Sequence, residues 1–420
     1  MSLLNPMNAE RAAAVPLDIA ALRAEFPQLR RKVHGIPLIY FDNANTAQKP
    51  QCVIDAVSRY YSEFNANVAR AVHTLGSEAT QHYEATRDKL QRFINAAHRE
   101  EIVFTTGTTA AINLVAYAWA LPKLQAGDVI LVSMMEHHAN IVPWQIVAER
   151  AGARVLPAPI TAAGEIDIEG TLAMMNERVK LFGITHVSNV LGTINPLRRL
   201  IDAAHARGIP VLVDGSQAVP HLPVDVQALD CDFYVFTGHK LFGPTGTGAL
   251  WARRDILQQM PPFFGGGEMI ERVGFDRTTY AMPPNRFEAG TPNIAGFVGL
   301  GAAIDWIERI GIERIAAREA ELGAYALARF EAIEGLRLIG TARERAPVFS
   351  FLIDGVHAHD LATLLDFEGV AVRSGQHCAH PLLQFFGVPA TARVSLAFYN
   401  TVEEIDAFVE ALSKVRTLLA

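Results

Sequence analysis

The sequence predicts an α/β protein built on a mostly parallel sheet that helices cover on both faces. Between roughly residues 100 and 260, strand-like apolar runs alternate with amphipathic helical runs, which is typical of this class. The pattern changes near residue 305, where longer helical runs precede a few short strands. We therefore expect a large domain over residues 32–304 and a smaller α+β domain over residues 305–420, with the N-terminal segment 1–31 packed on the smaller one.

Seven apolar runs are expected to form the strands of the large sheet. They are EIVFT (101–105), DVILVSM (128–134), ARVLPAPI (153–160), LFGITHVSNV (181–190), IPVLVDG (209–215), CDFYVFTG (231–238) and TGALWA (247–252). Residues 108–124 and 197–208 are amphipathic and predict helices; the second run ends on Gly208, a common signal for a helix C-terminus. In such sheets, ligands bind at the carboxyl ends of the strands.

Composition excludes several classes of function. The 420-residue chain has a formal net charge of −7 and no basic stripe, so electrostatics predict neither nucleic acid nor an anionic membrane as a partner. No apolar run reaches the roughly 18 residues that cross a bilayer, and the N-terminus lacks a secretory pattern, so a cytoplasmic protein is expected. Of the three cysteines, Cys52 and Cys231 are expected to be small buried side chains.

Two polar residues follow neighbouring predicted strands. Lys240 comes directly after the run 231–238, and Asp214 lies at the end of the run 209–215. The ordinary alternatives are a solvated lysine and an aspartate that caps a helix or turn. Together, however, an amine and a carboxylate at one edge of a sheet fit pyridoxal phosphate, whose aldehyde takes the amine and whose ring nitrogen pairs with the anion.

A phosphate-binding segment is predicted upstream, where Gly107 permits a tight turn and Thr108 and Thr109 begin a helix. Free N–H groups at a helix N-terminus favour an anion. Thr237 and His239 flank Lys240 with further hydrogen-bond donors.

The motif EHHAN (136–140) follows the strand 128–134 and offers adjacent histidines. Neighbouring residues cannot easily face one metal ion, and no other ligand cluster is apparent. We therefore expect no metal site, and interpret one of these histidines as a ring that stacks on a planar cofactor.

The run AVRSGQHCAHP (371–381) places Cys378 in a loop among Gly, His and Pro rather than inside an apolar pattern. Either a reactive thiol or an inert loop cysteine fits this position, and the local sequence leaves the two open.

Taken together, the motifs resemble those of the class V aminotransferase superfamily, and more narrowly the group II cysteine desulfurases of the SUF and CSD type. The resemblance runs from about residue 25 to residue 412. The motifs that carry it are EHHANIVPW (136–144), VSNVLGT (187–193), VDGSQ (213–217), TGHKLFGPTG (237–246), GGGEMI (265–270), FEAGTPN (287–293) and RSGQHCA (373–379).

The resemblance implies a fold-type I homodimer and a role for each matching residue. Lys240 matches the lysine that carries the cofactor as a Schiff base, Asp214 the partner of the ring nitrogen, Gln217 the residue near the 3-oxygen, and His137 the stacking histidine with a catalytic role. Thr108, Thr109, Thr237 and His239 fall on phosphate-contacting segments, which Thr291 would complete from the other subunit. Asn189, Arg373 and Arg393 match substrate-binding positions, and Cys378 matches the nucleophile that accepts sulfur.

The implied reaction converts L-cysteine to L-alanine and leaves the sulfur as a persulfide on Cys378, for iron–sulfur cluster assembly or other sulfur transfer. L-Selenocysteine is an alternative substrate, and a sulfur-acceptor protein is an expected partner. The short form RSGQHCA resembles group II rather than group I enzymes. A selenocysteine lyase, an aminotransferase and a non-catalytic persulfide carrier remain the alternatives.

Several positions depart from the family pattern. Ala69-Arg70-Ala71 stands where the family usually has His-Arg-Gly, and Thr106-Gly107-Thr108-Thr109-Ala110 replaces Arg-Gly-Thr-Thr-Glu. DNAN (42–45) replaces a usual Asp-Asn-Ala-Ala. Because the cofactor motifs are intact, these departures bear on partner choice, regulation and substrate preference rather than on the chemistry.

Overall fold

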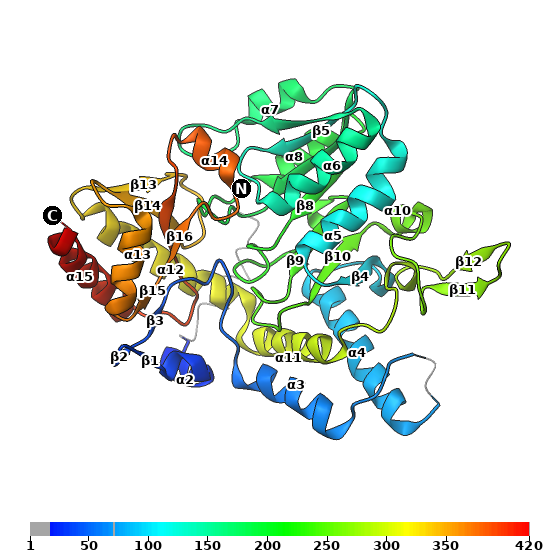
Figure 1. Ribbon diagram of the computed structural model, residues 1–420, viewed down its shortest axis with the longest axis horizontal. Coiled ribbons are helices and arrows are strands. Elements are labelled where there is room, and N and C mark those ends of the chain that lie inside the picture. The colour runs from blue at the N-terminus through cyan, green and yellow to red at the C-terminus, as the bar shows by residue number, and fades with distance from the viewer. Residues whose placement is uncertain (1–16, 70–71, 420) are drawn as a thin grey trace.

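A seven-stranded sheet forms the centre of the larger part of the molecule (Figure 1). The computed structural model describes residues 17–69 and 72–419. The strand order is β4-β10-β9-β8-β7-β5-β6, and only β10 runs antiparallel to its neighbours. The strands are β4 (Ile102–Thr105), β5 (Val129–Ser133), β6 (Arg154–Ala158), β7 (Val179–Thr185), β8 (Val211–Asp214), β9 (Phe233–Thr237) and β10 (Gly248–Ala252). All seven predicted strands are confirmed.

The strands form where they do because both faces of the sheet are buried. Every residue of β8 and β9 is buried, and the side chains alternate between two separate cores. Val211 and Val213 belong to the core on one face, whereas Leu212 belongs to the core on the other. A near-continuous apolar run is the pattern that a parallel sheet covered on both faces requires.

Helices cover the two faces. One core contains side chains of α3 (Gln51–Glu63), α4 (Thr74–Phe93), α8 (Leu197–His205), α9 (Val226–Leu229) and α11 (Ile294–Ile310). The other contains side chains of α5 (Thr108–Leu114), α6 (Val142–Ala151) and α10 (Arg254–Gln259). The helix predicted over residues 108–124 is α-helical only to Leu114. It continues as a π-helical segment, Val115–Ala120, and a 3-10 turn, Leu121–Lys123.

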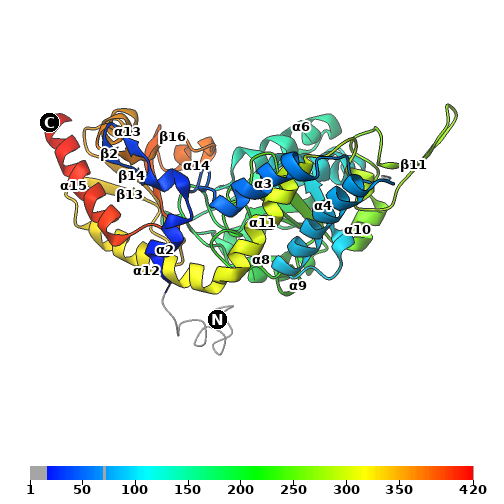
Figure 2. The ribbon, with the colours of Figure 1, turned by 90° about the horizontal axis from the view of Figure 1, so that it is seen from below.

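A second sheet of four antiparallel strands, ordered β13-β14-β17-β16, lies beside the first unit (Figures 1 and 2). Its strands are β13 (Leu336–Ile339), β14 (Val348–Ile353), β16 (Arg373–Gly375) and β17 (Thr391–Ser395). The helices α12 (Ile312–Glu331), α13 (Ala358–Phe367) and α15 (Val402–Leu419) share a core with it, and α14 (His380–Phe385) follows the cysteine loop.

Helices α11 and α12 connect the two units (Figure 2). Gly311, with φ at +93°, separates them, so the long helical run after residue 306 is divided at this left-handed glycine. The predicted boundary between residues 304 and 305 falls inside α11, which runs continuously through both residues. The predicted domain limits stay a prediction.

The N-terminal segment contacts both units, because Leu22, Phe26 and Leu29 belong to a core of the large sheet while other residues reach the second unit. Arg23 of α2 (Ile19–Ala24) pairs with Glu404 of α15 at 2.7 Å. After η1 (Pro27–Arg30) and the short pair β1 (Lys32–Val33) and β2 (Ile36–Pro37), strand β3 (Ile39–Tyr40) pairs in parallel with β15 (Val370–Ala371). This pairing brings residues 42–45 next to the end of β17, where Asp42 forms a bridge with Ser395.

The remaining elements are short. They are η2 (Arg99–Glu101), η5 (His138–Asn140), α7 (Ile168–Met174), the hairpin of β11 (Ile270–Val273) and β12 (Thr278–Tyr280), and η6 (Asn285–Phe287). Cys231 is buried as expected, but the expectation for Cys52 was wrong: it lies exposed on α3, whose core-facing positions Val53 and Tyr60 fall on other sides of the helix. Within residues 17–69 and 72–419, no helix combines the length and the apolar character that a membrane span needs.

Candidate active site

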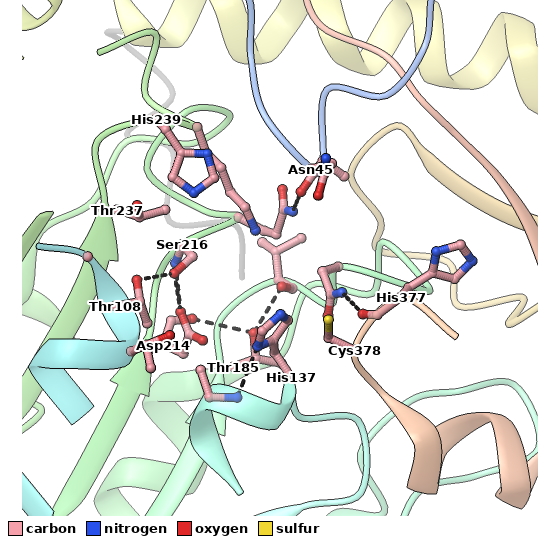
Figure 3. A pocket seen from close by; sticks show the side chains of 18 of the residues that line it. Asn45, Thr108, His137, Thr185, Asp214, Ser216, Thr237, His239, His377 and Cys378 are labelled. Atoms are coloured by element: carbon pink, nitrogen blue, oxygen red, sulfur yellow. Dashed lines mark hydrogen bonds between the residues drawn. The ribbon is translucent and has the colours of Figure 1, made fainter. Parts of the chain in front are cut away.

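One cavity of about 360 Å³ lies at the carboxyl ends of β8 and β9. Both units line it, because the second unit contributes Arg373, His377, Cys378 and Arg393. Asn45 reaches it from the N-terminal segment (Figure 3). The cavity is therefore enclosed by three parts of the chain that are far apart in sequence.

Lys240 faces this cavity from the turn after β9 and is only partly exposed. The turn is fixed through the carbonyl of the preceding residue, His239, which accepts hydrogen bonds from Lys49 Nζ at 2.6 Å and from the backbone N–H of Ala47 at 3.2 Å. Burial lowers the pKa of Lys240 to about 8, although the nearby Asp214 opposes this shift. A far larger fraction of this amine is therefore neutral near pH 7 than for a solvated lysine.

Asp214 ends β8 and is buried, with 4% of its surface exposed. Its Oδ1 accepts hydrogen bonds from the backbone N–H of Ser216 at 2.9 Å and from Ser216 Oγ at 2.6 Å. Burial raises the pKa of Asp214, whereas the Ser216 donors and Lys240 oppose the rise. A buried carboxylate is the group that would hold a protonated heterocycle nitrogen.

The N-terminus of α5 forms one wall of the cavity. Gly107, with φ at +145°, turns the chain, and the helix begins at Thr108. β10 passes so close that a Cβ on Gly248 would lie 2.6 Å from the Cα of Gly107. Thr109 and Thr237 also line this wall. Backbone N–H groups and hydroxyls at a helix start can bind a phosphate.

His137 precedes η5 and lines the same cavity as Lys240. Its Nδ1 accepts a hydrogen bond from the backbone N–H of Ala139 at 3.0 Å. Burial lowers the pKa of His137 to about 4, and Lys240 contributes to the shift. The ring is therefore neutral near pH 7, as stacking on a cationic cofactor ring requires.

Gln217 follows Asp214 on the same loop and is buried. Its Nε2 donates to the carbonyl of Ala44, and its Oε1 has no partner among the residues that the structure describes. A buried amide oxygen without a donor is costly, so this atom is suited to accept a hydrogen bond from a bound molecule.

Cys378 lies exposed on the loop that precedes α14 and lines the same cavity. His377 and Cys378 both have positive φ, at 51° and 55°, which non-glycine residues seldom adopt. Two hydrogen bonds hold this backbone: His138 N–H donates to the Cys378 carbonyl, and Asn189 Nδ2 donates to the His377 carbonyl, each at 2.8 Å. Hydrogen bonds from the larger unit thus hold the main chain of the loop in the conformation that places the Cys378 thiol at the cavity.

Arg393 of β17 is buried at the cavity wall. Its Nη1 donates to the Asn189 carbonyl at 2.9 Å and its Nη2 to Asp42 Oδ1 at 3.1 Å. Burial lowers the pKa of Arg393, whereas Asp42 raises it. Arg373 is exposed nearby and donates to Asn45 Oδ1 at 3.3 Å. Two guanidinium groups at one end of the cavity can bind a carboxylate.

The comparisons with known proteins agree with this geometry. The family model described as aminotransferase class-V matches residues 39–408. A probable cysteine desulfurase of Xylella fastidiosa (strain 9a5c) is 61% identical over 99% of this chain and 100% of its own length. The chain belongs to the cysteine desulfurase family of class-V aminotransferases. A cysteine desulfurase of Cronobacter sakazakii (strain ATCC BAA-894) is 51% identical over 96% of this chain and 99% of its own length.

Solved structures of cysteine desulfurases have the same fold. The Escherichia coli cysteine desulfurase CsdA, in an S-sulfonic acid form, is 40% identical and superposes with a TM-score of 0.90 over 97% of this chain and 100% of its own. The apo enzyme of Thermococcus onnurineus NA1 is 37% identical, with a TM-score of 0.87 over 93% of this chain and 98% of its own. The predicted family and the predicted fold class are confirmed.

The cysteine desulfurase cavity contains nearly every residue predicted for the site. Those that line it are Lys240, Asp214, Gln217, His137, Thr108, Thr109, Thr237, His239, Asn189, Arg373, Arg393 and Cys378. Thr291 does not line it, and its Oγ1 accepts a hydrogen bond from Asn67 Nδ2 at 3.3 Å. The roles that the resemblance assigns to these residues stay predictions.

Some lining residues were not predicted. They are Ala44, Asn45, Ala139, Thr185, Val187, Ser216 and His377. Ser216 and His377 lie within two residues of predicted ones, so sequence adjacency could have found them. Of the departures, Asn45, Thr106 and Ala110 line the cavity. Ala69 has φ at 57°, and Arg70 and Ala71 lie outside the described residues.

The cysteine desulfurase site fits pyridoxal phosphate on three observations. Asp214 is buried, and its Oδ2 accepts no hydrogen bond from any residue between 17 and 69 or between 72 and 419. Gln217 Oε1 is buried and also lacks a donor within those ranges. Lys240 and the start of α5 line the same space. These groups match a ring nitrogen, a ring oxygen, an aldehyde and a phosphate.

Proposed function

We infer that this chain is a pyridoxal-phosphate-dependent cysteine desulfurase, which converts L-cysteine to L-alanine and takes the sulfur onto Cys378. The observation that carries this inference is that one cavity contains Lys240, Asp214, Arg393 and an exposed cysteine. An aminotransferase has no use for that thiol, and a persulfide carrier without catalysis has no use for the amine of Lys240 and the buried carboxylate of Asp214.

The bound cofactor would supply an electron-accepting ring that stores the electron pair released at the substrate α-carbon. Asp214 Oδ2 would pair with its ring nitrogen, Gln217 would bind its 3-oxygen, and His137 would stack on the ring. The start of α5, with Thr237 and His239, would hold the phosphate.

Lys240 would carry the cofactor and then move the proton from the α-carbon. A base must be partly neutral at the working pH, and burial lowers the pKa of Lys240 to about 8. Asp214 keeps this pKa from falling further, so Lys240 can both accept and return a proton near neutral pH.

Arg393 would bind the substrate carboxylate, because a guanidinium pairs with a carboxylate in a fixed, bidentate geometry. Asn189 links this residue to the cysteine loop: its carbonyl accepts from Arg393, and its Nδ2 donates to the His377 carbonyl. Substrate binding and thiol position thus share one residue, Asn189, through its main-chain carbonyl and its side-chain amide.

Cys378, as a thiolate, would attack the substrate sulfur. A sulfur–sulfur bond forms, the bond from the substrate Cβ to sulfur breaks, and the released electron pair stays on Cβ, which takes a proton. The products are L-alanine and a persulfide on Cys378, and no external oxidant is required.

We further propose a cytoplasmic homodimer that passes the sulfur to an acceptor protein, for iron–sulfur cluster assembly or another sulfur-transfer route. The exposure of Cys378 supports transfer to a partner. The position of Thr291 outside the cavity of its own chain supports its donation to the other subunit.

Incubation with L-cysteine tests the proposal. The wild type should form equimolar L-alanine and, with a reductant, sulfide, whereas Cys378→Ala should lose alanine formation on the order of 100-fold while it retains the cofactor. Cys52→Ala, which changes the other exposed cysteine, is the matched control. Wild-type turnover by Cys378→Ala would exclude the persulfide route.

A further inference from the structure

A short chain of hydrogen bonds runs along the cavity wall from α5 to β8. Thr108 Oγ1 and Ser216 Oγ lie 2.6 Å apart, and Ser216 Oγ lies 2.6 Å from Asp214 Oδ1 (Figure 3). Thr108, Ser216 and Asp214 are all buried, with 8%, 7% and 4% of their surfaces exposed. Water therefore has little access to compete for these contacts.

The direction of the chain follows from the number of protons. An ionised carboxylate only accepts hydrogen bonds, so the hydroxyl of Ser216 must donate its one proton to Asp214 Oδ1. Thr108 Oγ1 must then donate to Ser216 Oγ if that contact is a hydrogen bond. The result is a one-way relay, Thr108 to Ser216 to Asp214.

The two oxygens of Asp214 are consequently different. Oδ1 accepts both donors of Ser216, the hydroxyl and the backbone N–H. Oδ2 accepts from no described residue, and Asp214 lines the cavity. Ser216 thus fixes which oxygen is left for a bound molecule.

We propose that Ser216 is a positioning residue, which keeps Asp214 ionised and turns Oδ2 toward the ring nitrogen of the cofactor. The relay also joins the two ends of the site, because Thr108 begins the helix that would hold the phosphate. This inference rests on the proposed function for the placement of the cofactor, and goes beyond it in assigning the hydroxyl of Ser216.

The charge of Asp214 depends on few other groups. Lys240 after β9 favours ionisation, whereas the neighbouring Glu136 after β5 is itself buried, with a pKa raised to about 8. Tyr234 of β9 has its pKa raised by burial and by Asp214, and burial lowers the pKa of His186 after β7 to about 4. Near pH 7 these groups leave the hydroxyl and the backbone N–H of Ser216, together with Lys240, as the principal supports of the anion.

Ser216→Ala tests the proposal, because it removes the hydroxyl and keeps the backbone N–H. Hydrogen bonds to charged groups are among the stronger ones, so the apoenzyme should bind pyridoxal phosphate on the order of 10-fold more weakly. A less anionic Asp214 makes the ring less electron-withdrawing. The pH midpoint of the absorption change of the bound cofactor should therefore rise, by on the order of half a pH unit or more.

Ser350→Ala is the matched control. Ser350 of β14 is also buried, and its Oγ donates to the Val190 carbonyl at 2.7 Å. It should lower thermal stability to a similar extent and leave the cofactor affinity and the pH midpoint at wild-type values.

A Ser216→Ala enzyme with wild-type cofactor affinity and an unchanged pH midpoint would overturn the proposal. This holds also if the variant loses thermal stability to the same extent as Ser350→Ala. A wild type that binds no pyridoxal phosphate would instead overturn the proposed function, and this inference with it.

Discussion

The carboxyl ends of the strands in the seven-stranded sheet, called the sheet edge below, and the cysteine loop hold their reactive groups in opposite ways. At the sheet edge, Asp214 is buried and fixed by a side-chain relay. In the loop, Cys378 is exposed, and its main chain rather than its side chain is gripped, through His138 and Asn189.

The difference matches the two tasks of a desulfurase. A cofactor that stays bound needs side chains that are already in place, since reorganisation during the reaction costs rate. A sulfur carrier must release its cargo, so its thiol has to remain accessible while its backbone is held. Substitutions at the sheet edge should therefore abolish alanine formation. Substitutions of the residues that hold the main chain of the cysteine loop should slow sulfur transfer.

Lys240→Ala should produce the largest effect. Removal of both the cofactor attachment and the base should lower alanine formation by roughly 10³-fold. Borohydride reduction followed by peptide mass spectrometry should place a pyridoxyl adduct on Lys240 in the wild type. Lys49→Ala, which removes the neighbouring amine that supports the turn, should retain the adduct. An adduct on another lysine would break the assignment.

Arg393→Lys should lower kcat/KM on the order of 100-fold, because lysine cannot reproduce the bidentate carboxylate contact or the two hydrogen bonds to Asn189 and Asp42. Cofactor binding should be retained, which kinetics and absorption spectra would show together. The exposed Arg343 gives a control, Arg343→Lys. Unchanged kcat/KM in Arg393→Lys would remove this residue from substrate binding.

The pH dependence of cofactor uptake should sharpen the account of the sheet edge. Burial lowers the pKa of Lys240 to about 8, and only the neutral amine attacks the aldehyde. The uptake rate of the apoenzyme should rise with pH and level off above pH 8, and should fall about tenfold for each unit below that value. Stopped-flow absorbance would measure it; a midpoint near that of free lysine would mean that the amine is solvated.

His138→Ala should produce the smallest effect, about two- to fivefold in the rate of persulfide formation. The variant keeps the backbone N–H that donates to Cys378 but loses the acceptor Nε2, which binds the backbone N–H of His380 at 3.1 Å at the start of α14. His359→Ala, an exposed histidine of α13, is the control. A loss as large as that of Lys240→Ala would contradict the division between edge and loop.

The sheet and the cofactor residues could be predicted because their signals are local. A run such as Val211-Leu212-Val213 is apolar at every position, since both faces are buried, and the polar residue that ends it marks the sheet edge. The family motifs added Arg393 and Asn189, which have no such local signal.

The rest could not be predicted, because it depends on contacts between distant segments. Asn45 reaches the cavity only because β3 pairs with β15, more than 300 residues away along the chain. The main chain of Cys378 is held by the backbone N–H of His138. The local sequence around either residue does not show that the two lie together. Cys52 was misassigned because its place on the exposed side of α3 depends on the rotation of that helix against the sheet.

The account depends most on where the sulfur is first taken up. After a single turnover with isotope-labelled L-cysteine, without reductant, mass spectrometry of the three cysteine-containing peptides would locate it. We expect one additional sulfur atom on Cys378 and none on Cys52 or Cys231. Stoichiometric L-alanine with labelled sulfur on another cysteine, or with no labelled peptide at all, would contradict the account.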